Sequence, residues 1–215
     1  MQTLFFTLGF DEKFILRWLT KLPLTEKDQI ILLTAHPLNP KVQEAKRSID
    51  LFLLKSTPIQ TTLYPIKLED FTQAVKQIKQ IVANHTQQAK QVKFILSGGM
   101  RALILATYTA IILSQETLKE KQKQIIVDLE NLEGYIQLPD ITKVIKPVQL
   151  TKEKKEILQL IENQPLTAKQ ISDILNKDTS TIYRHIMYLQ DLQLVNPDYK
   201  KTRKIHIAPE AKLLL

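Results

Sequence analysis

Hydrophobic and polar positions follow two different periods along the first 139 residues. Short runs rich in apolar residues, such as TLFFTL, QIILLTA and QVKFIL, predict buried strands. Between them, apolar residues recur every three or four positions, as at Val42, Ala45, Ile49 and Leu53, which predicts helices with one apolar face. Strands that alternate with helices indicate an α/β, Rossmann-like fold with a mainly parallel sheet. Right-handed crossovers then place helices on both faces of that sheet.

Individual segments of this region allow more specific predictions. Phe14, Trp18 and Leu22 fall at steps of four, so we expect them on the buried face of one helix. The run RALILATYTAIIL is apolar nearly all round, which predicts a buried helix. TTLYPI predicts a weaker strand because Pro65 lacks a backbone donor, and QIIVDLENLEGYIQL predicts a hairpin.

The pattern changes beyond residue 139. We expect residues 140–150 to be a linker, after which residues 151–215 show three helical stretches and a candidate pair of strands. Thr167 and Gln170 have the spacing of a capping box at the start of the second stretch. This order of elements predicts a winged helix-turn-helix domain, separate from a first domain at residues 1–139.

Charge supports DNA as the partner of this second domain. The chain has a net charge of +8, and residues 146–215 carry 12 Lys and Arg against 8 Asp and Glu. Small polar residues let a helix approach the major groove, an arginine reaches base edges or phosphates, and cations on a wing lie over phosphates. The predicted DNA contacts are Thr179, Ser180, Thr181, Arg184, Tyr188, Lys200, Lys201, Arg203 and Lys204. The alternative is a three-helix packing domain with a solvated basic hairpin, in which Tyr188 is half-buried.

Glycines mark a candidate site in the first domain. Three of the four glycines, Gly9, Gly98 and Gly99, fall where a predicted strand passes into a helix. Glycine lets a ligand approach the backbone, and amides at a helix start attract anions, to which Arg101 adds a bidentate donor. These residues predict a site for a phosphate-bearing ligand at the carboxyl ends of the strands. The alternative is a tight turn with Arg101 on the surface.

Other kinds of site find little support in the sequence. There is no cysteine, no GxxxxGK[ST], no GxGxxG and no HExxH, so we expect no disulfide, P-loop or zinc site. Asp128, Glu130 and Glu133 are acid/base candidates only in principle, since a hairpin is expected to leave them solvated. The longest apolar run is too short for a bilayer and the first residues lack a basic leader, so we expect a cytoplasmic protein without a membrane partner.

The combination of TLGFDEKF, SGGMRA and a winged helix resembles CRISPR-associated regulators of the CARF–winged-helix type. The resemblance implies a Rossmann-like domain that forms a homodimer and binds a cyclic oligoadenylate, often cyclic tetra-adenylate, across the two-fold axis. It also implies control of CRISPR loci and no cofactor beyond that effector. The ligand-binding positions that it implies are Thr7, Leu8, Gly9, Phe10, Ser97, Gly98, Gly99, Met100 and Arg101, with His36 and Asn39 of the loop AHPLNP as a lid.

Two other functions remain open at this level. Some CARF domains cleave their own cyclic ligand without a metal, and Thr7, Ser97 or a lysine are available to assist such a reaction. A regulator that senses a different phosphorylated metabolite through the same turns is the second. The Arg-to-His spacing of the ribonuclease domains found in many CARF proteins is absent, which favours DNA binding as the output.

Overall fold

The computed structural model describes residues 1–129, 134–141, 150–198 and 202–215. The chain forms two compact units, residues 1–146 and 147–215. The predicted linker, residues 140–150, lies mostly outside the described residues. Each unit is treated below by itself.

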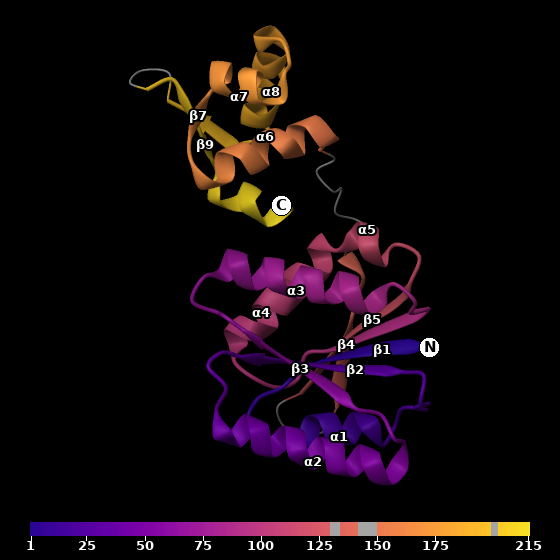
Figure 1. The fold of residues 1–215 in the computed structure, drawn as a ribbon. Coiled ribbons are helices and arrows are strands. Elements are labelled where there is room, and N and C mark those ends of the chain that lie inside the picture. The colour runs from indigo at the N-terminus through magenta and orange to yellow at the C-terminus, as the bar shows by residue number, and fades with distance from the viewer. Residues whose placement is uncertain (130–133, 142–149, 199–201) are drawn as a thin grey trace. The chain divides into compact units, whose positions relative to one another are not determined.

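A six-stranded sheet forms the centre of the N-terminal unit (Figure 1). Its strands are β1 (Gln2–Thr7), β2 (Gln29–Ala35), β3 (Thr61–Ile66), β4 (Gln91–Ile95), β5 (Gln122–Asp128) and β6 (Tyr135–Leu138). They lie in the order β3-β2-β1-β4-β5-β6, and all neighbours are parallel except β5 and β6. The predicted mainly parallel, Rossmann-like sheet and its terminal antiparallel pair are therefore confirmed.

Helices cover both faces of this sheet, as expected (Figure 1). The helices are α1 (Lys13–Leu19), α2 (Pro40–Ser56), α3 (Phe71–Thr86), α4 (Arg101–Leu113) and the short α5 (Gln115–Leu118). α1 and α2 pack on one face, and α3 and α4 on the other. Among the described residues, no helix is long and apolar enough to span a membrane.

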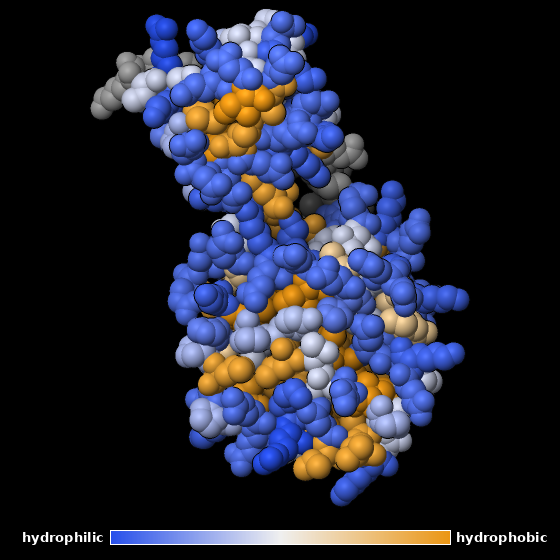
Figure 2. Space-filling model, in the orientation of Figure 1, coloured by the Kyte–Doolittle hydropathy of each residue, from blue (hydrophilic) through white to orange (hydrophobic). Residues whose placement is uncertain are grey.

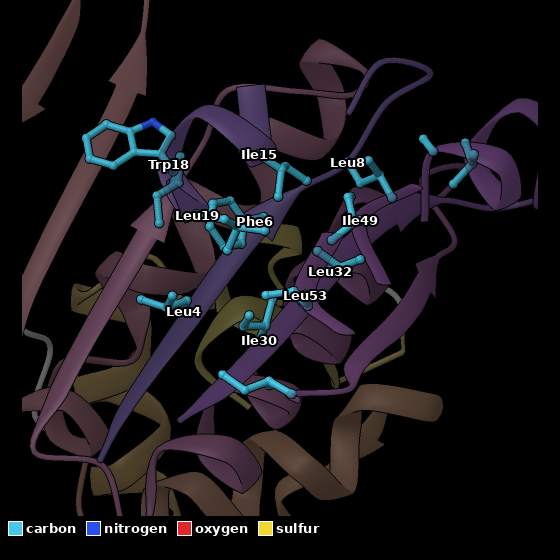
Figure 3. Close-up of a cluster of buried hydrophobic side chains, with 14 of the residues drawn as sticks. Leu4, Phe6, Leu8, Ile15, Trp18, Leu19, Ile30, Leu32, Ile49 and Leu53 are labelled. Atoms are coloured by element: carbon cyan, nitrogen blue, oxygen red, sulfur yellow. The ribbon is translucent and has the colours of Figure 1, made fainter. Parts of the chain in front are cut away.

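The core on the α1–α2 side follows from the two-residue period of the strands. Leu4, Phe6 and Leu8 point to this side from β1 and its end, and they meet Ile49 and Leu53 of α2 (Figure 3). Their neighbours in β1 point the other way, where the ring of Phe5 stacks on that of Phe94 with centroids 4.9 Å apart. The central strands are thus buried on both faces, which is why their sequences are almost continuously apolar.

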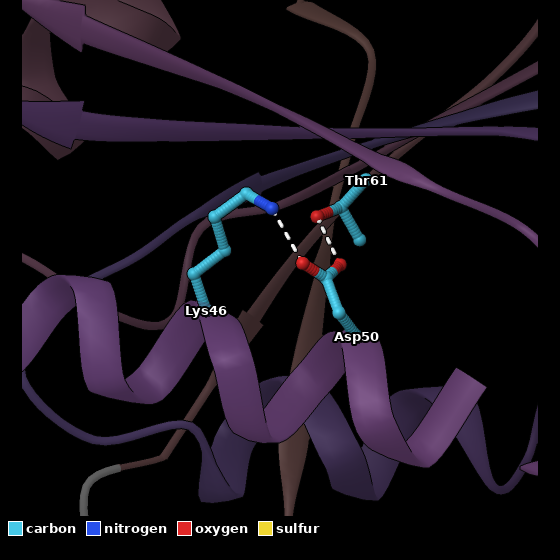
Figure 4. Close-up of polar contacts among 3 residues, drawn as sticks. All are labelled: Lys46, Asp50 and Thr61. Atoms are coloured by element: carbon cyan, nitrogen blue, oxygen red, sulfur yellow. Dashed lines mark hydrogen bonds and ion pairs between the residues drawn. The ribbon is translucent and has the colours of Figure 1, made fainter. Parts of the chain in front are cut away.

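Polar contacts fix α2 to the edge of the sheet. Lys46 and Asp50 of α2 form an ion pair, and the hydroxyl of Thr61 in β3 donates to the same carboxylate at 2.6 Å (Figure 4). β3 is an edge strand, so the missing donor of Pro65 leaves no ladder hydrogen bond unmade inside the sheet.

Two predictions about helix faces were wrong. In α1 the buried residues are Ile15, Trp18 and Leu19, whereas Phe14 is half-buried and Leu22 lies beyond the helix end. α4 is apolar nearly all round but not buried all round, because Leu105 is 60% exposed. Periodicity shows how apolar a helix is, but not how much of it the neighbouring elements cover.

The C-terminal unit has the architecture of a winged helix-turn-helix domain. It consists of α6 (Lys152–Asn163), β7 (Leu166–Thr167), α7 (Ala168–Leu175), α8 (Thr179–Asp191), β8 (Val195–Pro197), β9 (Lys204–Ile207) and the 3-10 helix η2 (Pro209–Leu214). The predicted pair β8–β9 forms, and β7 adds a third strand in the order β7-β9-β8. The capping box of Thr167 and Gln170 at the start of α7 is confirmed.

Candidate functional site

The loops after β1 and β4 meet at the point where the order of the strands reverses. β1 and β4 are neighbours in the sheet, but β1 leads to β2 on one side and β4 to β5 on the other. In open α/β sheets such a switch point leaves a crevice beyond the carboxyl ends of the strands, where ligands bind. The three glycines lie in these two loops.

The glycines allow these loops to pack backbone against backbone. A Cβ on Gly9 would lie 2.6 Å from the amide nitrogen of Gly99, and one on Gly98 would lie 2.7 Å from the carbonyl oxygen of Thr7. Gly99 also has a φ of 88°, a conformation that other residues rarely adopt. The glycines are thus required by the approach of one loop to the other, a reason that sequence analysis missed.

Two predicted ligand-binding hydroxyls make hydrogen bonds inside this arrangement. The buried Thr7 accepts a hydrogen bond from the amide of Gly98 at 3.2 Å. Ser97 accepts one from the amide of Asp128, also at 3.2 Å. Both hydroxyls therefore fix the loops to the sheet, and neither side chain lines the adjoining pocket.

A pocket of about 420 Å³ opens beside the two loops. Seven predicted site residues line it, namely Leu8, Gly9, Phe10, His36, Asn39, Gly99 and Met100. Ala35 and Pro37, from the same predicted loop as His36 and Asn39, also line it, as do two residues that the sequence did not indicate, Thr34 of β2 and Val42 of α2. Gly98 lies outside the lining, as does Arg101, which is exposed in the first turn of α4.

The surroundings of the pocket favour an anion. α4 begins here after Met100, which makes no side-chain capping hydrogen bond, and no acidic residue occupies the first turn of this helix. The free amides of a helix start carry partial positive charge. No carboxylate stands among the described residues that line the pocket. Asn39, by contrast, caps α2 by accepting a hydrogen bond from the amide of Lys41 at 2.9 Å.

The expectation that Asp128 is solvated was wrong. Its carboxylate is buried, and the indole Nε1 of Trp18 donates to its two oxygens at 3.1 and 2.9 Å. Tyr135 packs edge-on against the same indole, with ring centroids 5.0 Å apart. Asp128 is therefore a buried acceptor that holds α1 to β5. Glu130 and Glu133 lie outside the described residues.

In the C-terminal unit, the turn between α7 and α8 is fixed by hydrogen bonds. Asn176 adopts a left-handed conformation with φ 50°, which ends α7. Ser172 donates its hydroxyl to the carbonyl of Lys177 at 2.6 Å, and the same hydroxyl lies 3.0 Å from Oγ1 of Thr179. These bonds set the position at which α8 begins.

The predicted DNA-binding residues of α8 lie largely on its exposed face. Ile182, Ile186 and Leu189 are buried on the opposite side. Of the predicted set, Thr179, Ser180, Arg184 and Tyr188 are exposed, while Thr181 is half-buried and accepts a hydrogen bond from Nη2 of Arg184 at 3.1 Å.

Sequence analysis missed two large side chains on this helix. Tyr183 and Met187, near Arg184 in the sequence, are 48% and 50% exposed. Figure 2 shows hydrophobic surface over α7 and α8. Apolar side chains on a reading helix can contact the methyl group of thymine.

The wing is formed by β8 and β9. Arg203 has a φ of 53° and donates its amide to the carbonyl of Asp198 at 2.8 Å, which closes the turn before β9. Arg203 and Lys204 are exposed, as the DNA-binding prediction requires. Lys200 and Lys201 lie outside the described residues.

Fold and sites define the class of this protein as a Rossmann-like domain followed by a winged helix-turn-helix domain. Residues 2–139 match the family described as the Csa3 CRISPR-associated Rossmann-like domain. Residues 151–196 match a helix-turn-helix family described as bacterial regulatory protein, arsR family. The chain thus belongs to the Csa3 family, and its resemblance to CARF–winged-helix proteins is confirmed. No curated protein matches the chain.

These two matches show the general function of the chain. The chain is a CRISPR-associated transcriptional regulator, and its helix-turn-helix domain indicates DNA as the partner.

Proposed function

We propose that this regulator responds to a cyclic oligoadenylate, in the first place cyclic tetra-adenylate, which binds at the pocket beyond β1, β2 and β4. The observation that carries the proposal is the chemistry of that pocket. It lies at the switch point of the sheet, it adjoins the uncapped start of α4, and no carboxylate stands among its described lining residues. Phe10, Pro37 and Met100 supply apolar surface for a base, while the helix start favours a phosphate.

Two copies of the chain share the ligand in this proposal. A ring of four identical nucleotides has two equivalent halves, which matches two subunits related by a two-fold axis. Phe10, Met100 and Leu105 are exposed apolar residues in the loop after β1 and at the start of α4. Figure 2 shows apolar surface on this unit near the start of α4. A second copy that covers this surface would remove it from water.

Arg101 is assigned to the part of the ligand that extends beyond one pocket. Its side chain is exposed directly after Met100, which lines the pocket, so it is accessible to a phosphate at the pocket mouth. A guanidinium binds a phosphate with two parallel hydrogen bonds. In the C-terminal unit, the proposal assigns DNA binding to the exposed face of α8, and the exposure of Arg184 supports this assignment.

Calorimetric titration with cyclic oligoadenylates of several ring sizes tests the proposal. We expect the four-membered ring to bind with a stoichiometry of one ring for each pair of chains. Arg101→Ala should weaken this binding at least tenfold while the affinity for DNA stays within about twofold. Arg47→Ala, an exposed arginine on α2, is the matched control and should change neither affinity.

The outcomes of this titration are distinct. Binding of one ring to each single chain would remove the shared site, and equal losses of ligand and DNA affinity in Arg101→Ala would show that the ligand site is misplaced. Chromatography of the incubated ligand separates the intact ring from linear oligoadenylate. An intact ring agrees with a sensor, whereas a linear product would show that the chain is also a ring nuclease.

A further inference from the structure

Tyr188 has a partner that its sequence position does not suggest. The ammonium group of Lys154 in α6 lies over the ring of Tyr188, with Nζ 4.3 Å from the ring centroid. This distance is well inside the range of about 6 Å at which a cation is attracted to an aromatic face. The ring of Tyr188 is therefore directed to the start of α6, and it holds a lysine that lies 34 positions earlier in the chain.

Cations from three segments of the C-terminal unit lie near His185 of α8. The pKa of His185, three positions before Tyr188 in α8, lies below its usual value because the side chain is partly buried and because Lys154, Arg184 and Lys177 lie near it. Glu153 is the acidic residue that opposes them. α6, the turn before α8 and α8 itself thus each bring a cation to one side of the predicted reading helix. Repulsion among these cations is relieved when an anion binds beside them.

We propose that Lys154 contacts a DNA phosphate and that Tyr188 positions it, rather than reading a base. The inference rests on the proposed DNA-binding role of α8. A lysine ammonium is a compact point charge suited to phosphate oxygens, and the aromatic ring limits where that charge moves. Phosphate contacts fix the register of a protein on the duplex, while base contacts choose the sequence. Lys154 thus supplies a phosphate contact from α6, in addition to the contacts expected from α8 and from the cations of the wing.

The salt dependence of DNA binding tests whether Lys154 contacts a phosphate. The probes are a duplex selected by the full chain from a randomised library and a shuffled duplex of the same length and composition. Lys154→Ala should weaken binding to both duplexes by a similar factor, about three- to tenfold, and reduce the slope of log affinity against log salt by about 1. Lys155→Ala is the matched control, because Lys155 is the next residue of α6 and is exposed; it should keep the slope of the native chain.

Variants of Tyr188 test the positioning role. Tyr188→Phe keeps the ring and should bind as the native chain does, whereas Tyr188→Leu should reproduce part of the loss of Lys154→Ala. In the Lys154→Ala background, Tyr188→Leu should add no further loss. Circular dichroism confirms the fold of each variant.

Two results would overturn the inference. One is a native salt slope in Lys154→Ala. The other is an altered preference between the two duplexes in Tyr188→Phe, which would make the hydroxyl a base reader. A native chain that binds neither duplex would contradict the proposed DNA-binding function itself, a different outcome.

Discussion

The close packing of the loops after β1 and β4 depends on the absence of a Cβ atom at their glycines. In Gly9→Ala the new Cβ would lie 2.6 Å from the backbone nitrogen of Gly99, so one loop must move away from the other. We expect the free energy of unfolding to fall by about 1–3 kcal/mol. Gly134→Ala is the matched control, because among the described residues its Cβ would meet only Cδ1 of Leu129, at an ordinary 3.5 Å. Urea unfolding followed by circular dichroism measures both, and equal stability of the two variants would contradict this packing.

The buried carboxylate of Asp28 makes the free energy of unfolding depend on pH. Burial alone would raise the pKa of Asp28, but hydrogen bonds from Gln2 and Thr25 outweigh it and hold the pKa below its usual value. The stabilisation by this carboxylate is therefore complete above the pKa of the unfolded chain, near 3.8, and is lost as the pH falls through the lowered value. We expect Asp28→Asn to be less stable than the native chain at pH 7, with a difference that shrinks as the pH falls below about 4.

Unfolding in urea across this pH range measures the effect. Glu26→Gln, an exposed change in the same segment before β2, is the control and should follow the native profile. A stability difference between Asp28→Asn and the native chain that stays constant down to the lowest pH would show that the carboxylate acts only through its shape.

At the scale of elements, the exposed side of α4 is part of the proposed dimer interface. A charge at its exposed position 105, as in Leu105→Asp, places an ion inside the proposed interface, where its desolvation is unfavourable. We expect this variant to be monomeric in sedimentation velocity at concentrations where the native chain is a dimer. Leu54→Asp on α2 is the control, because Leu54 is even more exposed, at 71% against 60%, and lies outside the proposed interface. Dimers of unchanged stability in Leu105→Asp would place the interface elsewhere.

The order of strands and helices could be predicted from the sequence, because the two-residue and near-four-residue periods are strong in these elements. The exposure of α4 and the buried face of α1 could not, since they depend on which neighbours cover a helix. The ends of β1 and β4 were recognisable from their glycines. Thr34 and Val42 of the pocket were not, because they approach the loops only once β2 lies beside β1.

The DNA-binding face shows the same limit. Small polar residues and Arg184 led to the prediction that α8 is the reading helix. Tyr183 and Met187 were missed because their residue types occur equally in cores. Lys154 was missed because its contact with Tyr188 joins two helices that are distant in the sequence. Sequence patterns report the local period, whereas these positions follow from tertiary packing.

For the whole molecule, we propose that residues 1–146 bind the ligand and that residues 147–215 bind DNA in response. Coupling between them requires that the ligand bind two arrangements of the dimer with different affinity. By linkage, DNA then changes the affinity for the ligand by the same factor as the ligand changes the affinity for DNA.

The most direct test is the affinity of the full chain for its selected DNA duplex, measured by fluorescence anisotropy with and without saturating cyclic tetra-adenylate. We expect the affinity to change at least about fivefold, in either direction, which corresponds to an allosteric coupling of about 1 kcal/mol or more. The same change should need a higher ligand concentration in Arg101→Ala. An affinity for DNA that stays the same when the ligand is bound would contradict the proposed coupling between the two sites.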